Sequence, residues 1–280
     1  AGPSRIVAFA VAALVAGAVA MAISPVFVRH AEVGPFTSAF YRVFLALPAL
    51  WLWSRLENRG ADALPDPGWT RPILTVGALF AGDLFFWHLA VVNTTIANAT
   101  LLATMAPVWV MAFSGLFIGE PVTRRMLAGL VLCVAGGMLL IGASSSVAPE
   151  RFLGDLYGVA TSLFFGLYFL AVRVARRTAP PGLVLFRSTV VTAAILGVVA
   201  LALENAWLPA GLAGVVALVL MANVSHVGGQ GLLAFALGHL SAAFSSLVIF
   251  LEALAAALFG FLFFGETLGP LEMAGGAGIL

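Results

Sequence analysis

The chain has 280 residues, of which 62% are hydrophobic and 9% charged, and its mean hydropathy is +1.11. A soluble domain carries about 25% charged residues, so this composition excludes soluble enzymes, nucleic-acid-binding proteins and secreted disulfide scaffolds. The single cysteine, Cys133, lies in an apolar stretch and is expected to be a core residue. The sequence therefore predicts an integral membrane protein that has the lipid bilayer as a partner and no nucleic-acid partner.

Ten apolar runs, bounded by Pro, Gly or charge, predict ten helices, because a membrane-spanning helix needs roughly 20 apolar residues. The predicted spans are 5–28, 35–54, 71–92, 95–118, 124–143, 153–175, 181–203, 210–235, 240–263 and 269 onward. The first run is too long for the apolar region of a signal peptide, so we interpret it as a retained span. The last run reaches Leu280 after 12 residues, and we expect the tenth helix to be incomplete.

The arginines predict the orientation of the chain, since every one of its 13 cationic residues is Arg. If the amino terminus is cytoplasmic, the outer loops contain only Arg29 and Arg151, and the cytoplasmic segments contain nine arginines. These nine are Arg5, Arg55, Arg59, Arg71, Arg124, Arg125, Arg173, Arg176 and Arg177. We therefore expect a multi-pass protein of the bacterial inner (plasma) membrane with its amino terminus in the cytoplasm.

Similar residues recur at an offset of about 145 positions. Gly119-Glu120 aligns with Gly265-Glu266, and Tyr41-Arg42 aligns with Phe186-Arg187. Chance explains apolar matches in such a chain, but it does not easily explain an Arg and a Glu that recur in the same order. Because each half has five helices, the second half must enter the membrane from the opposite side. We predict an all-α membrane protein of two inverted five-helix repeats, residues 1–143 and 150–280, which is typical of transporters.

These features resemble a known group of membrane carriers. The ten-span pattern, the aromatic-Arg pairs of spans two and seven, and the Gly-Glu ends of spans four and nine are similar to the drug/metabolite transporter superfamily and its EamA family. Within that family the chain resembles the YddG-type aromatic amino acid exporters. The resemblance covers essentially the whole chain. It implies a central cavity surrounded by helices one to four and six to nine, more peripheral fifth and tenth helices, and transport in the export direction.

Polar and aromatic residues within the spans are candidates for a substrate cavity, because polar groups that face lipid are costly. Span eight presents Asn223, His226 and Gln230 at spacings that place them on one helical face. The candidate cavity residues are Trp87, His88, Trp109, Tyr168, Phe165, Asn223, His226, Gln230, Phe250, Met105 and Tyr41. Their aromatic faces suit an indole or phenyl group better than a sugar or phosphate. The alternative is ordinary helix packing and structural hydrogen bonding.

Charged residues and prolines inside the spans suggest further roles. Asp83 and Glu252 are candidates for proton or charge coupling, since intramembrane carboxylates are costly; alternatively Asp83 pairs with an Arg or accepts a backbone hydrogen bond. Arg42 and Arg187 either extend toward an interface or attract a substrate carboxylate. Pro107 is predicted to kink span four, whereas span nine has Ala253 at the matching place; this asymmetry would let span four bend while span nine moves as a rigid helix. The candidate structural or gating residues are Pro107, Arg42, Arg187, Glu120 and Glu266.

The predicted function is a secondary transporter that exports aromatic, and potentially other neutral, amino acids or related metabolites by alternating access through a central cavity. A small-molecule substrate is the expected partner; no cofactor or metal is predicted, and a monomer is compatible with the sequence. The chain lacks Lys and any phosphate-binding Gly-x-x-x-x-Gly-Lys motif, so a substrate or ion gradient must supply the energy. The main alternative is a carrier for an aliphatic amino acid, a drug-like amphiphile or a nucleotide sugar. An intramembrane enzyme and a channel are less well supported by the motifs.

Overall fold

The computed structural model describes residues 3–57, 66–94, 96–142, 149–264 and 269–280. Within these ranges all the regular structure is helical. The first half comprises α1 (Pro3–Ala22), α2 (Ser24–Arg29), α3 (Pro35–Phe44), α4 (Leu47–Glu57), α5 (Arg71–Asn93), α6 (Ile96–Ala103), α7 (Ala106–Phe117) and α8 (Arg124–Gly142). The second half begins with the 3-10 helix η1 (Pro149–Arg151) and continues with α9 (Phe152–Ala175), α10 (Pro181–Leu203), α11 (Leu212–Leu220), the π-helix η2 (Met221–Gln230), α12 (Gly231–Ala236), α13 (Ala242–Val248), α14 (Phe250–Phe264) and α15 (Pro270–Ile279).

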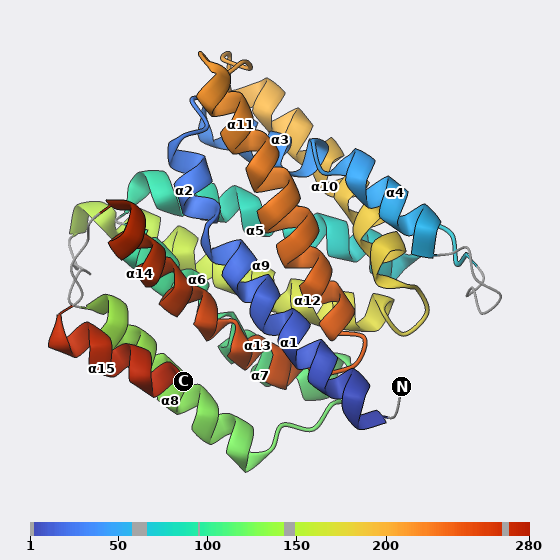
Figure 1. Cartoon of the computed structure of the whole chain (residues 1–280), viewed down its shortest axis with the longest axis vertical. Helices are drawn as coiled ribbons and strands as arrows, with labels where there is room; N and C mark the ends of the chain where they lie inside the picture. Colours follow the sequence, from blue (N-terminus) through green and yellow to red (C-terminus); the bar gives the residue numbers. More distant parts are fainter. Residues whose placement is uncertain (1–2, 58–65, 95, 143–148, 265–268) are drawn as a thin grey trace.

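The helices combine into ten consecutive segments in the described chain, in the order that the apolar runs predict. Five of them are interrupted: α1 continues into α2, α3 into α4, α6 into α7, α11 through η2 into α12, and α13 into α14. Eight segments are long and apolar enough to cross a membrane. The other two, α8 and α15, pack against each other at one edge of the bundle (Figure 1). The prediction of an all-α multi-pass membrane protein is confirmed.

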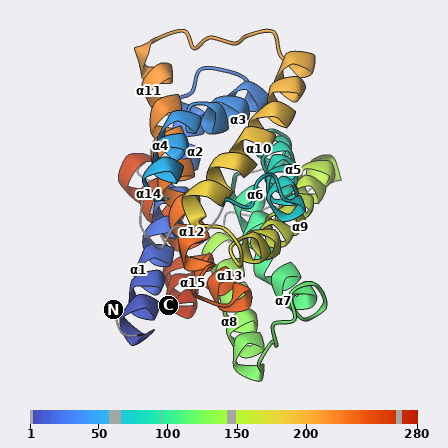
Figure 2. The ribbon, with the colours of Figure 1, turned by 90° about the vertical axis from the view of Figure 1, so that its right-hand side faces the viewer.

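The two halves pack around each other as two repeats related by a twofold axis would. Helix α5 of the first half packs on α9 at the start of the second half, and η2 of the second half packs on α1. Likewise α7 packs on α9, and α14 packs on α1. Equivalent segments also meet directly, as α3 does with α10 (Figure 2). Each of these pairs is reproduced when the halves are exchanged, and the largest apolar core cluster takes residues from both repeats.

Two glutamates tie the second and seventh segments together at their ends. Glu57 at the end of α4 accepts a hydrogen bond of 2.8 Å from the backbone N–H of Gly182, in the first turn of α10. Glu204 at the end of α10 accepts hydrogen bonds of 2.8 and 2.9 Å from the backbone N–H groups of Phe36 and Thr37, in the first turn of α3. A carboxylate at a helix start satisfies otherwise unpaired N–H groups and interacts favourably with the helix dipole. Each half therefore caps a helix of the other half.

Two of the helix interruptions bear on the predicted kinks. In the fourth segment α6 ends at Ala103 and α7 begins at Ala106, with Pro107 in its first turn, as predicted. The ninth segment, which was expected to move as one rigid helix, is also interrupted, because α13 ends at Val248 and α14 begins at Phe250. There the backbone N–H of Glu252 bonds to the carbonyl of Ile249 at 2.8 Å, a tight turn that needs no proline. Both corresponding helices are therefore broken.

Gly77 allows α5 and α10 to cross closely. A Cβ at this position would lie 2.6 Å from the carbonyl oxygen of Ser188, and Thr192 donates a hydrogen bond of 2.9 Å to the Gly77 carbonyl. We expect Gly77→Ala to lower the thermal unfolding temperature in detergent, because overpacking costs about 1–3 kcal/mol. Gly115→Ala is the control, since its Cβ would meet nothing closer than 3.9 Å and alanine favours helix. Equal unfolding temperatures for Gly77→Ala and wild type would contradict the close crossing.

Candidate functional site

A cavity of about 70 Å³, partly open to its surroundings, lies between the two halves. Its wall is formed by residues of α1, α2, α3, α5, α6, α9, η2 and α14, together with Thr104 at the break of the fourth segment and Ile249 at the break of the ninth. The sequence-predicted residues on this wall are Arg42, Asp83, Trp87, Phe165, Gln230 and Glu252. A volume of this size holds a few water molecules, whereas pockets for organic ligands measure about 300–1,000 Å³. The cavity must therefore widen before it can accommodate an organic substrate.

Three charged side chains of the wall come from different helices. Arg42 of α3 and Asp83 of α5 are buried, and Glu252 of α14 is half-buried. The guanidinium of Arg42 donates a hydrogen bond of 3.1 Å from Nη1 to Ser24 Oγ and lies 6.0 Å from the centre of the Phe80 ring. Among the described residues, Arg42 makes no ion pair within 4.0 Å of Asp83 or Glu252. The proposed direct pairing of Asp83 with an Arg is therefore not the arrangement found.

Gln230 is held in place by polar contacts on two sides. Its amide oxygen accepts a hydrogen bond of 3.0 Å from the hydroxyl of Tyr168, and its amide nitrogen donates to Met21 Sδ at 3.2 Å. Tyr168 in turn packs against Phe80 and stacks on Phe165, with ring centroids 4.9 and 5.9 Å apart. Tyr168 thus supports the cavity from behind, while Gln230 and Phe165 form part of its wall.

Asn223 does not share the inward face of Gln230. It is exposed, and its amide donates a hydrogen bond of 2.9 Å to the carbonyl of Val219, in the preceding helix α11 of the same segment. His226 is fully buried behind the wall, where Nε2 is 2.9 Å from Thr189 Oγ1 and its ring stacks on Phe80. The spacing argument assumed an α-helix, but Met221–Gln230 is a π-helix with wider turns. Asn223 and Gln230, which are seven residues apart, are therefore separated by fewer than two turns and do not lie on the same face.

The other aromatic candidates separate into one cavity residue and several packing residues. Trp87 lies on the wall, whereas the neighbouring His88 is buried and Nδ1 bonds to the Leu84 carbonyl at 2.7 Å. Trp109 donates from Nε1 to Ser162 Oγ at 2.9 Å, away from the wall. The remaining three belong to apolar clusters outside the cavity wall: Phe250 and Met105 in the cluster beside α8 and α15, and Tyr41 in the cluster beside α2 and α11.

Several wall residues carry no signal strong enough to single them out in the sequence. The hydroxyls of Thr100, on α6, and Thr104, in the break between α6 and α7, belong to this group, as do the apolar Leu84, Ile249 and Ala256. Small polar residues in otherwise apolar spans are the only available signal, and they occur at many other positions. Ser24 and Met21 contribute to the wall at the break between α1 and α2.

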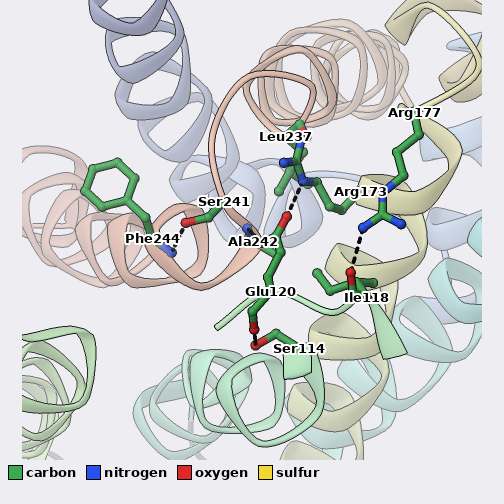
Figure 3. Close-up of polar contacts among 9 residues, drawn as sticks. All are labelled: Ser114, Ile118, Glu120, Arg173, Arg177, Leu237, Ser241, Ala242 and Phe244. Carbon is green, nitrogen blue, oxygen red and sulfur yellow. Dashed lines mark hydrogen bonds and ion pairs between the residues drawn. The ribbon is translucent and has the colours of Figure 1, made fainter. Parts of the chain in front are cut away.

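One end of the bundle is closed by polar contacts that centre on Glu120, after α7. Its carboxylate accepts hydrogen bonds from Arg173 Nε at 2.6 Å and from the backbone N–H of Ala242, in the first turn of α13, at 2.8 Å (Figure 3). Arg173 Nη1 also donates to the carbonyl of Leu237 at 2.8 Å. We call these four residues the Glu120 network. It joins the ends of the fourth, sixth and eighth segments to the start of the ninth.

Arginines next to this network reinforce the same end. Arg177 donates to the carbonyl of Ile118 at 2.7 Å (Figure 3). Arg176 donates to the carbonyls of Ala234, at 2.9 Å, and Ala179. Glu266, the predicted counterpart of Glu120, lies outside the described residues. All these donors are in or just after the last turn of α9, so the sixth segment makes most of the contacts that close this end.

Arg187 has a partner outside the spans. Its Nη1 and Nη2 groups both donate to the carboxylate of Asp66 at 2.6 Å, and Nη1 also donates to the Gly68 carbonyl. The guanidinium lies 5.6 Å from the ring of Trp69. These hydrogen bonds hold the pKa of Asp66 below its usual value. Arg187 thus fastens the segment before α5 and is not part of the cavity wall.

Comparison with known proteins gives the family. The EamA-like transporter family matches residues 8–142 and again residues 152–280. The chain belongs to this transporter family. The two matches correspond to the two five-helix halves, and the EamA-like fold explains the paired packing of the segments.

Individual relatives are more distant. An uncharacterized transporter of Archaeoglobus fulgidus is 28% identical and aligns with 99% of this chain and 95% of its own. The pseudopaline exporter CntI of Pseudomonas aeruginosa is 28% identical over 88% of this chain and 82% of its own. The aromatic amino acid exporter YddG of Ancylobacter novellus is 31% identical over 41% of this chain and 40% of its own. A solved crystal structure shares the fold, with a TM-score of 0.80 at 20% identity over 99% of this chain and 95% of that one.

Proposed function

We propose that this EamA-like protein is a secondary transporter that exports aromatic and other neutral amino acids, or closely related metabolites, by alternating access. The observation that carries the proposal is the cavity between the two halves, because it combines Arg42, Asp83 and Glu252 with the aromatic rings of Trp87 and Phe165. An amino acid has both kinds of group: charges at its α-carbon, and an apolar or aromatic side chain. The names of YddG and CntI, both described as exporters, support the export direction.

The proposed mechanism uses the two halves, residues 1–143 and 150–280, as the units that move relative to each other. The Glu120 network joins segments of both halves, and several arginines lie at the same end. Under the positive-inside rule this end faces the cytoplasm of a bacterial inner membrane, and the amino terminus lies there too. We propose that breaking this network opens the cavity to cytoplasmic substrate and that exchanging the arrangements of the two halves releases it outside.

The same observations favour a carrier over an enzyme. The family is a transporter family, and the charged residues of the wall serve binding in this proposal. A carrier binds its substrate in every cycle, so its transport saturates and it can exchange substrate across the membrane. An open channel shows neither property.

A second candidate is a carrier for another metabolite. The similarity to the pseudopaline exporter extends over most of the chain, whereas the similarity to the aromatic amino acid exporter covers less than half of it. A more elaborate metabolite with amino and carboxyl groups would use the same three charged side chains. The two candidates differ in the size of the rest of the substrate and not in the charges that the cavity must accommodate.

Counterflow in liposomes tests the proposed function. Purified protein is reconstituted with a mixture of the twenty amino acids inside the vesicles, and uptake of labelled tryptophan, phenylalanine or threonine is followed. We expect saturable exchange that is stronger for tryptophan and phenylalanine than for threonine, because the wall contains Trp87 and Phe165. Exchange of threonine alone would contradict the aromatic preference. No exchange of any amino acid by folded protein would contradict the proposed substrates and favour the second candidate.

A further inference from the structure

Three charged side chains on the cavity wall have hydrogen-bond donors or acceptors that no protein group in the described part of the chain uses. Arg42 uses Nη1 to reach Ser24, but its buried Nε has no hydrogen-bond partner in the structure. No hydrogen bond is found for the carboxylates of Asp83 and Glu252 among the described residues. All three side chains are on the cavity wall. The unused donors and acceptors therefore border the same small space.

This arrangement is costly unless something else occupies the space. Burying a charge without a partner costs several kcal/mol, and a direct ion pair recovers part of that cost. Arg42 attracts both Asp83 and Glu252 electrostatically, yet it does not come within ion-pair distance of either one. The three residues are fixed on α3, α5 and α14, so helix packing holds the opposite charges apart. A ligand that carries both signs of charge can fill the gap and pair with both sides.

We propose that Arg42, Asp83 and Glu252 form a head-group site for a zwitterion, in which Arg42 binds the carboxylate and the two acidic side chains bind the ammonium group. The inference rests on the proposed transport function and specifies the chemical class of its substrate. In an α-amino acid the two charged groups are attached to one carbon, which suits a cavity with little free volume between fixed opposite charges. Arg is well suited to a carboxylate because its planar guanidinium donates parallel hydrogen bonds.

The rest of the substrate would lie against the aromatic part of the wall. Trp87 and Phe165 contribute rings to the same cavity as the three charges. Binding of the whole substrate requires the cavity to widen, and a large side chain requires more widening than the head group does. The site also selects against two other classes: an uncharged amphiphile leaves all three charges unpaired, and a multiply negative phosphate faces repulsion from Asp83 and Glu252.

The first experiment measures binding without transport. Purified protein in detergent is titrated with tryptophan, with tryptamine, which lacks the carboxylate, and with indole-3-propionate, which lacks the ammonium group, and the shift of the unfolding temperature gives each affinity. Leucine, isopentylamine and 4-methylpentanoate form a second, aliphatic set. We expect the zwitterion of at least one set to bind at least about tenfold more tightly than both of its analogues, because each lost charged contact leaves a buried charge unpaired.

Substitutions then assign each charge of the ligand to its side chain. In Arg42→Gln the advantage of the amino acid over the amine should disappear, while its advantage over the acid remains. In the double variant Asp83→Asn/Glu252→Gln the advantage over the acid should disappear instead. Arg187→Gln is the control, because Arg187 pairs with Asp66 outside the cavity, and it should leave both ratios unchanged. If the charges had a purely structural role, the variants would change the stability of the protein. They would not each remove one of the two affinity ratios, amino acid to amine or amino acid to acid, while leaving the other.

The outcomes separate the site from the proposed function. Equal binding of all three members of both sets, or no binding of any of them by folded protein, would overturn the zwitterion site. Ratios that do not respond to Arg42→Gln would overturn the assignment of the carboxylate. Zwitterion-selective binding without counterflow would support the site and contradict amino acid transport. Counterflow without selectivity for the zwitterion would support transport and contradict the site.

Discussion

Trp87→Ala is expected to reduce the initial rate of tryptophan counterflow at least tenfold and to change the unfolding temperature little. Trp87 is on the cavity wall, which Asp83 and Phe165 also line. Removing it takes away apolar contact that an aromatic substrate would bury, and burial of one such side chain is worth about 1.5–3 kcal/mol. The ring borders the cavity on one side, so removing it breaks fewer packing contacts than removing a core residue. The unfolding temperature should therefore change little.

Trp109→Ala is the matched control for this experiment. Trp109 is the same residue type, one segment further along the chain, but it donates a hydrogen bond to Ser162 and stacks on Phe113, with ring centroids 6.3 Å apart. Replacing a core Trp with Ala costs about 3–5 kcal/mol, and we expect somewhat less here because Trp109 is half-buried. The unfolding temperature should fall, while the rate per folded molecule stays close to wild type. Equal losses of rate in both variants would contradict the position given to the cavity.

Glu120→Gln is expected to make the cavity accessible from the end that the Glu120 network closes. The substitution removes the charge that Arg173 and the backbone N–H of Ala242 share. Hydrogen bonds to charged groups contribute about 1.5–3 kcal/mol, and a loss of about 2 kcal/mol changes the ratio of closed to open protein roughly thirtyfold. The other end of the bundle retains its own contacts, so the shift should favour opening at this end alone.

Labelling of a cavity cysteine measures this change. In a Cys133→Ala background, Ala103→Cys places a thiol on the cavity wall, and inside-out vesicles present the proposed cytoplasmic face to a membrane-impermeant maleimide. We expect labelling to be at least tenfold faster with Glu120→Gln. Glu32→Gln is the control, because Glu32 accepts a hydrogen bond of 2.7 Å from Gly211 N–H at the opposite end. Unchanged labelling in Glu120→Gln, or an equal increase in the control, would contradict the closing role.

The fold was predictable because it depends on features that the sequence displays over long stretches. Apolar runs fix the number of segments, and the recurrence of Gly-Glu and aromatic-Arg pairs indicates two repeats. The breaks between helices were less predictable: Pro107 marks one of them, but the break at Ile249 has no proline and arises from a local tightening of the backbone. The capping glutamates, Glu57 and Glu204, also escaped the repeat comparison, although their positions at the ends of spans two and seven correspond.

The site was predictable where its helices are regular. Asp83 and Trp87 are four residues apart on α5, and both line the cavity, as α-helical spacing requires. Asn223 and Gln230 are on η2, where the π-helix shifts the relation between sequence spacing and face. Trp109 and Phe250 show a different difficulty. An aromatic residue that lines a cavity and one that packs between helices have the same hydropathy and residue type. Only tertiary packing distinguishes the two.

The exchanged caps have a consequence for how the protein is made. The N–H groups of Phe36 and Thr37 emerge from the ribosome long before Glu204, which accepts their hydrogen bonds. During synthesis the start of α3 must therefore wait, with its amides bonded to water, until seven segments have been made. A first half produced alone lacks this cap, and a second half produced alone lacks Glu57 at Gly182. Each half is thus a partner required for the assembly of the other, and two separately translated halves would recover their helix starts only by meeting in the same membrane.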